Sequence, residues 1–214
     1  NKSIKLDQNC SFTYMLRSYL NLETELFKEA LSDVNQAIKI NARKNNDKRY
    51  GYDSIQIPST ISFFYEIKGT AKYYLEEYKD ENAIQDFDQA IKYNSDNLSA
   101  FFYRGLSYKN LKNYTEALKD LDNVIIKDPK NKQKLNYFAL VNKAGIEIET
   151  GNEKKAIKNL DQAIELDPQN YISFLRRGIS YFNLNKDKEA LCNFNKAIEL
   201  DPKDAESFQM RGRT

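Results

Sequence analysis

One phrase of 18 residues returns along this chain at a regular interval. Residues 185–202 read NKDKEALCNFNKAIELDP, and residues 151–168 read GNEKKAIKNLDQAIELDP, 34 positions earlier. Related phrases occupy residues 113–129, 80–93 and 27–40. A sequence that repeats at such a period folds into units that bury their apolar faces against their neighbours. The repeat therefore constrains the fold more tightly than any other feature of the chain.

Each phrase carries a small residue, a large apolar residue four positions later and a second small residue three positions after that. In the last copy these residues are Ala190, Phe194 and Ala197. Spacings of three and four place side chains on one face of an α-helix. The phrase thus predicts a helix whose two alanines let a neighbouring helix approach closely while the large side chain fills the space between them.

A second helical pattern precedes the phrase. Its apolar positions are spaced four and three residues apart, as in Phe174, Gly178 and Tyr181. An Asp-Pro pair follows the phrase three times, at residues 128–129, 167–168 and 201–202. Because proline stops a helix, the repeating unit is predicted to be helix, turn, helix and stop.

The composition indicates a helical chain without catalytic chemistry. There are only 7 Gly and 4 Pro among 214 residues, which is too few for a turn-rich β fold. The chain has no histidine, which excludes Ser-His-Asp triads, Cys-His dyads and histidine metal ligands. Its two cysteines, Cys10 and Cys192, are too few for a zinc site or a disulfide framework. We therefore predict that the protein is not an enzyme and uses neither a metal nor a cofactor.

The charge balance and the hydropathy of the chain indicate where the protein is located in the cell and which partners it does not favour. With 33 basic and 31 acidic residues the net charge is +2, so the chain has no general basic field for nucleic acid or a membrane surface. The chain contains no run of about 18 apolar residues, the length that a helix needs to span a bilayer. The first residue is Asn1, and no signal peptide precedes it. We expect an intracellular, cytoplasmic domain excised from a longer protein, with any targeting signal outside this fragment.

These residues resemble the tetratricopeptide repeat (TPR) family, whose period is 34 residues. The family pattern has an aromatic residue at position 4, Gly at 8, Tyr at 11, Ala at 20, an aromatic residue at 24, Ala at 27 and Pro at 32, and residues 171–204 match all seven. The resemblance implies further repeats at about 11–44, 64–97, 98–131 and 137–170, a partial repeat or capping helix at 205–214, and inserts at about 45–63 and 132–136. It also implies an all-α fold, a right-handed superhelical solenoid of antiparallel helix pairs in a single domain.

The longer insert is predicted to be a partly ordered loop. Residues 45–63 read NNDKRYGYDSIQIPSTISF, and the side chains of Tyr50 and Tyr52 could dock on a neighbouring helix. Ser59 or Thr60, just after the proline, is the expected N-cap of the next helix.

In the TPR family the first helix of each pair lines a concave groove that binds peptides or segments of partner proteins. The resemblance therefore implies a protein–protein interaction scaffold, with the groove at repeat positions 2, 5, 6, 9, 12 and 13. Most residues at these positions are apolar or aromatic. The groove candidates are Tyr65, Lys68, Lys72, Phe102, Tyr103, Leu106, Phe138, Val141, Asn142, Leu175, Arg176, Ile179 and Phe182.

Two interpretations of these apolar residues stay open. They could pack sideways on adjacent helices as ordinary core. Alternatively, those from Phe102 to Ile179 could form one continuous apolar patch that takes a helical or extended partner segment, a second copy of the chain or the inserted loop. We favour the patch, because a residue one position along a helix from the packing face points about 100° away from that face.

Two other binding functions find less support in the sequence. Chaperone-binding TPR domains hold a carboxylate with lysine, arginine and asparagine from three successive repeats, and no three repeats here supply that set. A co-chaperone domain would therefore have to lack the usual clamp. An RNA-binding repeat needs a basic stripe along its groove. The clustered cations lie instead at repeat ends and inserts: Lys39, Arg43, Lys44, Lys48, Arg49, Lys127, Lys130, Lys132 and Lys134.

Overall fold

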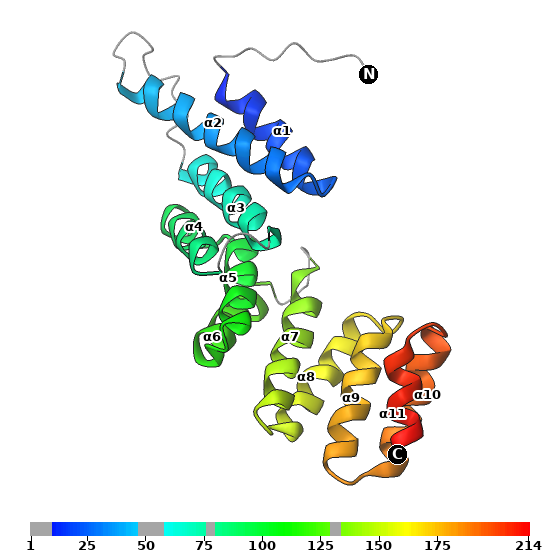
Figure 1. The fold of residues 1–214 in the computed structure, drawn as a ribbon. Coiled ribbons are helices and arrows are strands. Elements are labelled where there is room, and N and C mark those ends of the chain that lie inside the picture. Colours follow the sequence, from blue (N-terminus) through cyan, green and yellow to red (C-terminus); the bar gives the residue numbers. More distant parts are fainter. Residues whose placement is uncertain (1–9, 47–57, 76–79, 129–133) are drawn as a thin grey trace. The chain divides into compact units, whose positions relative to one another are not determined.

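The computed structural model describes residues 10–46, 58–75, 80–128 and 134–214 (Figure 1). Within these ranges the chain forms eleven α-helices and no β-strand. The helices before residue 114 are α1 (Ser11–Glu23), α2 (Phe27–Asn46), α3 (Pro58–Tyr74), α4 (Asp80–Tyr93) and α5 (Leu98–Asn110). The later helices are α6 (Tyr114–Lys127), α7 (Leu135–Glu149), α8 (Glu153–Leu166), α9 (Tyr171–Asn183), α10 (Asp187–Leu200) and α11 (Ala205–Arg213).

The chain divides into two compact units, residues 1–113 and residues 114–214. In the first unit α1 packs on α2, α3 packs on α4, and α5 packs on both α3 and α4. In the second unit α6 packs on α7, α7 on α8, α9 on α10, and α11 on α10. Figure 1 shows the helices of each pair side by side. This arrangement confirms the all-α fold of helix pairs that the repeat predicts.

The small residues of the repeat phrase lie where the helices approach one another most closely. Ala190, Phe194 and Ala197 of α10 are fully buried. The ring of Phe194 lies against Gly178 of α9, where an added Cβ atom would come within 2.5 Å of a ring carbon. Since packed protein interiors leave no room for such an overlap, the glycine allows these two helices their close approach.

The first helix of the second repeat is two residues out of the expected register. The family pattern aligns Ala71 with the position of the close-approach glycine. In the structure Gly69 of α3 lies against the ring of Phe87 on α4, and a Cβ atom added there would be 2.7 Å from the ring. The expected register of this helix is therefore wrong, because the glycine, and not the alanine, meets the large side chain across the pair.

The start of α3 also differs from the expectation. The helix begins at Pro58, and proline suits the first turn because that turn needs no N–H donor. Ser59 and Thr60 lie inside this turn, so the expectation that one of them caps the helix is wrong. Tyr50 and Tyr52, which we expected to dock on a neighbour, lie outside the described residues.

A cation recurs in the first helix of each pair and joins that helix to others. Arg177 of α9 donates from Nε to Asn193 of α10 at 2.8 Å and from Nη1 to Asp161 of α8 at 2.7 Å. Its guanidinium lies 5.5 Å from the centre of the Phe174 ring, and a ring face attracts a cation. The corresponding cations of the other first helices are Arg17, Lys68, Arg104, Lys143 and Arg211.

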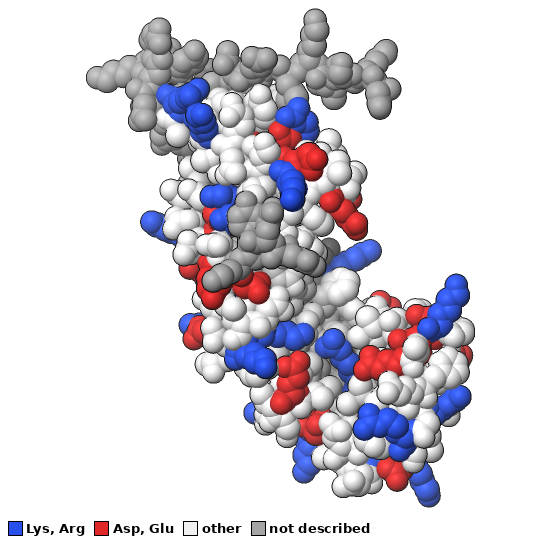
Figure 2. Space-filling view, viewed as in Figure 1, with Lys and Arg blue, Asp and Glu red and all other residues white. Residues whose placement is uncertain are grey.

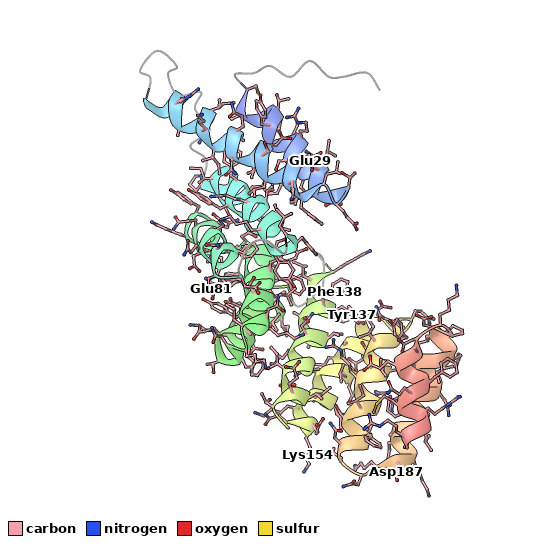
Figure 3. The ribbon with its side chains drawn as sticks, in the orientation of Figure 1. Glu29, Glu81, Tyr137, Phe138, Lys154 and Asp187 are labelled. Atoms are coloured by element: carbon pink, nitrogen blue, oxygen red, sulfur yellow. The ribbon has the colours of Figure 1, made fainter. Side chains whose placement is uncertain are left out.

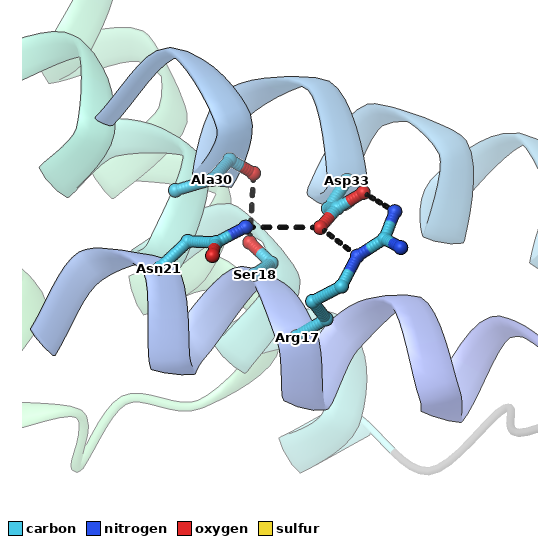
Figure 4. Close-up of polar contacts among 5 residues, drawn as sticks. All are labelled: Arg17, Ser18, Asn21, Ala30 and Asp33. Atoms are coloured by element: carbon cyan, nitrogen blue, oxygen red, sulfur yellow. Dashed lines mark hydrogen bonds and ion pairs between the residues drawn. The ribbon is translucent and has the colours of Figure 1, made fainter. Parts of the chain in front are cut away.

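The α1–α2 pair shows this arrangement with its supporting hydrogen bonds (Figure 4). Two guanidinium nitrogens of Arg17 donate to the carboxylate of Asp33, the Nε bond measuring 2.6 Å. Asn21 donates to the same carboxylate at 3.1 Å, and the Ser18 hydroxyl donates to the carbonyl oxygen of Ala30 at 2.8 Å. Because Asp33 and Ser18 are buried, these bonds satisfy polar groups that would otherwise destabilise the packing.

The turns between first and second helices share one backbone conformation. The second residue after the first helix is left-handed in all four turns that the structure describes: Glu25 (φ 59°), Lys112 (φ 59°), Gly151 (φ 71°) and Asn185 (φ 57°). In the last turn the amide of Asn185 donates back to the carbonyl oxygen of Phe182 at 2.9 Å. Three of the four are not glycine, and an L-residue is strained in this region of backbone space.

Candidate functional site

The first unit carries a cleft on the face formed by α1, α3 and α5. These helices contact one another in series, α1 with α3 and α3 with α5, and the cleft has a volume of about 540 Å³. That volume is in the range of protein sites that bind small molecules or peptide side chains. We call it the tyrosine cleft. It is lined by Tyr19, Leu22, Glu23, Glu25, Phe27, Phe63, Glu66, Ile67, Thr70, Tyr74, Ser99 and Tyr103.

Aromatic rings form much of the wall of the tyrosine cleft. Phe27 and Tyr74 stack with their ring centres 4.8 Å apart, and the hydroxyl oxygens of Tyr74 and Tyr103 are 3.4 Å apart. Tyr19 lies beside Phe63, with 5.7 Å between the ring centres. Tyr19 and Tyr74 remain 41% and 47% exposed. Large rings that are held by one another and still open to solvent suit the binding of a partner side chain.

A carboxylate lies among these rings. Glu66 of α3 accepts a hydrogen bond from the side-chain amide of Asn97 at 2.7 Å, and Asn97 also donates to the Ser62 hydroxyl at 3.0 Å. The side-chain oxygen of Asn97 accepts from the Ala100 amide and so caps α5. Burial raises the pKa of Glu66, although the hydrogen bonds from Asn97 and Ser99 act in the opposite direction.

Two phenols of the tyrosine cleft, those of Tyr19 and Tyr103, have raised pKa values. The Tyr19 hydroxyl donates to Glu23, and this bond, together with burial and the nearby charges of Glu23 and Glu66, raises the pKa of Tyr19. Burial is also the main cause of the raised pKa of Tyr103, and its contact with Tyr74 adds to it. No lysine or arginine of the described ranges is among the lining residues. The cleft is therefore acidic and aromatic.

The three groove candidates of α3 face α4 instead of the cleft. Tyr65 stacks on Tyr93 of α4, with ring centres 6.1 Å apart. The ammonium groups of Lys68 and Lys72 pair with the carboxylate of Asp86 on α4 at 3.1 and 2.5 Å. Their assignment to the groove is therefore wrong. The two-residue shift in register brings other side chains of α3 to the cleft: Phe63, Glu66, Ile67, Thr70 and Tyr74.

A short sequence signal identifies the correct register of α3. Residues 101–105, 174–178 and 208–212 each read as an aromatic residue, two variable residues, a cation and glycine. Residues 65–69, YEIKG, have the same order. Lys68 then corresponds to Arg177, and its ammonium lies 5.9 Å from the centre of the Tyr65 ring as the common pattern requires.

The candidates on α5 divide between cleft and core. Tyr103 lines the tyrosine cleft. Phe102 is only 7% exposed, and Leu106 is half-buried. In the second unit Val141 of α7 and Leu175 of α9 are each 5% exposed. The expected continuous apolar patch is therefore wrong at three of its members, since Phe102, Val141 and Leu175 are core side chains.

The remaining candidates lie on α7 and α9, which contact each other within the second unit. Phe138 is 48% exposed, beside the buried Tyr137 (Figure 3). Arg176 donates to the carbonyl oxygen of Val141 at 2.8 Å, and burial lowers the pKa of its guanidinium. Phe182 lies 5.8 Å from the guanidinium of Arg213 on α11.

The last two candidates complete that face. Asn142 of α7 donates to the carbonyl oxygen of Phe138 at 2.9 Å, so its amide is engaged within its own helix. Ile179 of α9 is partly buried against the core of the second unit. The α7–α9 face therefore offers Phe138 as its most exposed apolar side chain.

On the face that Figure 2 shows, the charges of each unit do not form a basic stripe. Lysine, arginine, aspartate and glutamate are interspersed on the face of each unit that Figure 2 shows. Lys48, Arg49, Lys130 and Lys132, four of the cations considered for RNA binding, lie outside the described residues. Three glutamates line the tyrosine cleft and would repel a phosphate backbone, so this cleft does not fit RNA.

The described ranges contain neither a membrane-spanning helix nor a metal-binding cluster. None of the helices there combines the length and the apolar character that crossing a bilayer requires. Those ranges also hold no group of three or more cysteine, aspartate or glutamate side chains suited to a metal ion. Within those ranges neither Cys10 nor Cys192 takes part in a disulfide.

Antiparallel helix pairs that meet through small residues, with a cleft on the face of the first helices, define a helical-repeat protein of the solenoid class. Sequence models of the tetratricopeptide repeat match residues 68–132, 139–170 and 172–204. The chain belongs to the tetratricopeptide repeat family. A TPR fold implies a protein–protein interaction scaffold, and proteins of this family are in general non-catalytic.

The chain matches parts of two longer proteins. Human sperm-associated antigen 1 is 33% identical over 107 residues, which are 50% of this chain and 11% of that protein. TPR repeat-containing protein MJ1428 of Methanocaldococcus jannaschii is 26% identical over 201 residues, which are 86% of this chain and 30% of that protein. The chain thus spans less than a third of either relative.

Solved structures support the fold. YrrB, described as a TPR protein with an unusual peptide-binding site, is 18% identical and has a TM-score of 0.69, with 99% of this chain and 96% of YrrB covered. MamA from Desulfovibrio magneticus RS-1 is 20% identical and has a TM-score of 0.70, with 94% of this chain and 98% of that one covered. At these identities the likeness establishes the TPR fold.

Proposed function

We propose that this chain is a non-catalytic interaction module that binds a peptide segment of a partner protein in the tyrosine cleft. The observation that carries the proposal is the cleft itself, about 540 Å³ on the face of α1, α3 and α5, with tyrosine rings open to solvent at its wall. Solvent-exposed tyrosines bind partners well because they offer a large contact area and lose little conformational entropy on binding.

The lining also defines the kind of segment that fits. Leu22 and Phe63 supply apolar contacts, while Ser99 supplies a hydroxyl group. A wholly apolar segment would leave the polar groups without partners and lose affinity. The segment is therefore amphipathic, with apolar side chains seated on the rings and polar groups directed to the hydroxyls and carboxylates.

The α7–α9 face of the second unit stays a separate prediction. Phe138 is exposed there, whereas Val141 and Leu175 are buried. A single exposed ring provides less contact area than the set of rings in the tyrosine cleft, so we assign the principal site to the first unit. YrrB is the solved relative whose description includes a peptide-binding site, and peptide binding by this chain is consistent with that family role.

A peptide selection tests the proposal. The whole chain is used to select binders from a random dodecapeptide phage library, and synthetic versions of the selected peptides are titrated by calorimetry. Tyr19→Ala and Tyr74→Ala should each weaken binding at least about tenfold, because each removes a ring from the cleft. Tyr93→Ala on α4 is the matched control, since Tyr93 is similarly exposed, at 38%, and lies outside the cleft.

Circular dichroism confirms that each variant keeps its helical content. If the selected peptides bind both cleft variants as tightly as the parent chain, the proposal is wrong. If binding is lost instead in Phe138→Ala, the site lies on the α7–α9 face and the assignment to the tyrosine cleft is overturned.

A further inference from the structure

We propose that the tyrosine cleft selects a partner segment by one lysine or arginine side chain, whose charged end pairs with Glu66 while its aliphatic stem lies along the tyrosine rings. This inference rests on the proposed function and names the chemistry that the same site recognises. It follows from a comparison of the partners of Glu66 with the partners of other carboxylates in the first unit.

Three carboxylates that lie between helices of the first unit are paired with cations, whereas Asp80 of α4 accepts a hydrogen bond from the neutral side chain of Asn110 on α5. Asp33 is paired with Arg17, and Asp88 of α4 is paired with Arg104 of α5. Asp86 is paired with two lysines of α3. Glu66 is partly buried at the wall of the tyrosine cleft, and its hydrogen bonds come from the neutral side chains of Asn97 and Ser99. Among the described residues, no lysine or arginine pairs with it.

Burial destabilises the ionised form of a carboxylate when only neutral groups donate hydrogen bonds to it. Burial removes water from the charge, and this raises the pKa of Glu66. A cation brought next to it regains Coulomb energy in surroundings of lower dielectric constant than bulk water. The charge of Glu66 therefore favours an incoming ammonium or guanidinium group over a neutral or anionic one.

The protein already uses the arrangement that such a side chain would complete. Arg17 lies between the ring of Tyr14, 5.4 Å from the ring centre, and the carboxylate of Asp33. Arg104 lies between the ring of Phe101, at 5.5 Å, and Asp88. In both cases a cation contacts an aromatic face on one side and a carboxylate on the other.

The tyrosine cleft contains the ring and the carboxylate of this arrangement. Glu66 lies close enough to Tyr19 and Tyr103 for its charge to contribute to the raised pKa of both phenols. Both rings line the cleft, and so do Glu23 and Glu25. An ammonium or guanidinium entering the cleft thus meets aromatic faces and three carboxylates, and no lysine or arginine of the described residues lines the cleft to repel it.

The test begins with the random dodecapeptide phage library described above, selected on the whole chain and, in parallel, on Glu66→Gln. Glutamine keeps the size and the hydrogen-bond acceptor of Glu66 and removes its charge. Glu29→Gln is the matched control, because Glu29 lies on α2 in the same unit and outside the cleft (Figure 3). Peptides from the parent selection are synthesised with each lysine or arginine and, separately, with norleucine in its place.

The expected result has two parts. The parent chain and Glu29→Gln should both enrich peptides with one fixed basic residue beside apolar residues, and Glu66→Gln should not. Replacing that residue with norleucine should weaken binding to the parent chain at least about tenfold and should weaken binding to Glu66→Gln much less. This difference between the two losses is a coupling between the peptide cation and Glu66, which a merely structural role of Glu66 would not produce.

Two results would overturn the inference, and they can be told apart from a failure of the proposed function. If the selected peptides lack a fixed basic residue, but still lose affinity in Tyr19→Ala, the cleft binds peptides and the cation requirement is wrong. If a basic residue is fixed and its replacement costs the same affinity in both chains, the cation binds elsewhere than at Glu66. Peptides that are insensitive to both tyrosine variants refute the proposed function itself.

Discussion

Gly69 of α3 lies so close to Phe87 of α4 that a Cβ atom added to the glycine would be 2.7 Å from the ring. This contact sets the rotation of α3 about its own axis. With Gly69 toward α4, the helix turns Glu66 and Tyr74 toward α1 and α5, where they line the tyrosine cleft. The same rotation places Lys68 beside Asp86. One close contact within a helix pair therefore decides which residues reach the binding face.

Gly69→Ala tests that contact directly. The added methyl group has to displace a fully buried ring, and overpacking of this kind lowers the free energy of unfolding by about 1–3 kcal/mol. Urea denaturation followed by circular dichroism measures the loss. Gly212→Ala is the control, because no atom lies within 4 Å of the position that its Cβ would take. A Gly69→Ala chain as stable as the parent would show that the ring can move aside.

Phe194→Ala should be among the most destabilising single changes in the second unit. Phe194 is fully buried, and removing a buried phenylalanine ring costs about 3–5 kcal/mol. Gly178→Ala should be harmful in the parent chain but much less so in the Phe194→Ala chain, because the ring that blocks the new methyl group is gone. A double-mutant cycle of unfolding free energies measures this coupling. Additive effects of the two changes would contradict the contact between them.

Asn185→Gly should stabilise the α9–α10 turn. Asn185 has a φ of 57°, a region that costs a non-glycine residue energy and that glycine adopts without strain. After the extra entropy of glycine in the unfolded chain is subtracted, we expect a gain of about 0.5 kcal/mol, measured as a higher denaturation midpoint. Lys188→Gly, inside α10, serves as the opposite control and should cost about 1 kcal/mol. A loss of stability in Asn185→Gly would contradict the argument.

Glu66→Gln should raise the stability of the folded chain at neutral pH while it weakens peptide binding. Burial raises the pKa of Glu66, so the folded state binds its proton more tightly than the unfolded state does. Stability therefore falls as the pH rises from the ordinary range of glutamate through the raised pKa. Glutamine has no charge to be buried, so the variant avoids this loss.

Denaturation midpoints of the parent chain and Glu66→Gln, compared from about pH 4 to pH 8, check this prediction. The variant should be the more stable chain at the upper end, and the difference should shrink as the pH falls and Glu66 becomes protonated. Tyr19 and Tyr103 stay protonated throughout, because the pKa of each phenol is raised. A constant difference across the pH range would mean that the charge of Glu66 does not carry the effect.

The sequence by itself determined the helix pairs and the residues that hold each pair together. Ala190, Phe194 and Ala197 were identified from spacing alone, and all three are fully buried. The additional helix expected from about Ala205 begins there. These features follow from sequence because spacings of three and four residues fix which side chains share a helix face. Glycine, alanine and proline also affect the backbone at their own positions.

Only the tertiary structure decided which residues of neighbouring helices each helix face contacts. Counting repeats from the alanines of the second helices placed Lys68 and Lys72 in the groove, yet Gly69, two positions before Ala71, is the residue that meets Phe87. Ala71 and Gly69 differ by about 200° around the helix axis, so they lie on nearly opposite faces of α3, and the contact of Gly69 with the ring of Phe87 decides between the two registers.

For the same reason the sequence predicted a continuous apolar patch that the structure does not contain, and it did not predict the tyrosine cleft. Helical phase gives the direction of Phe102, Val141 and Leu175, but their burial depends on what packs over them. The character of Glu66 likewise depends on neighbours from α1 and α5 that are distant in sequence. Direction along a helix is a local property, whereas burial, pairing and pKa arise from the packing of separate helices, and only the folded chain supplies that information.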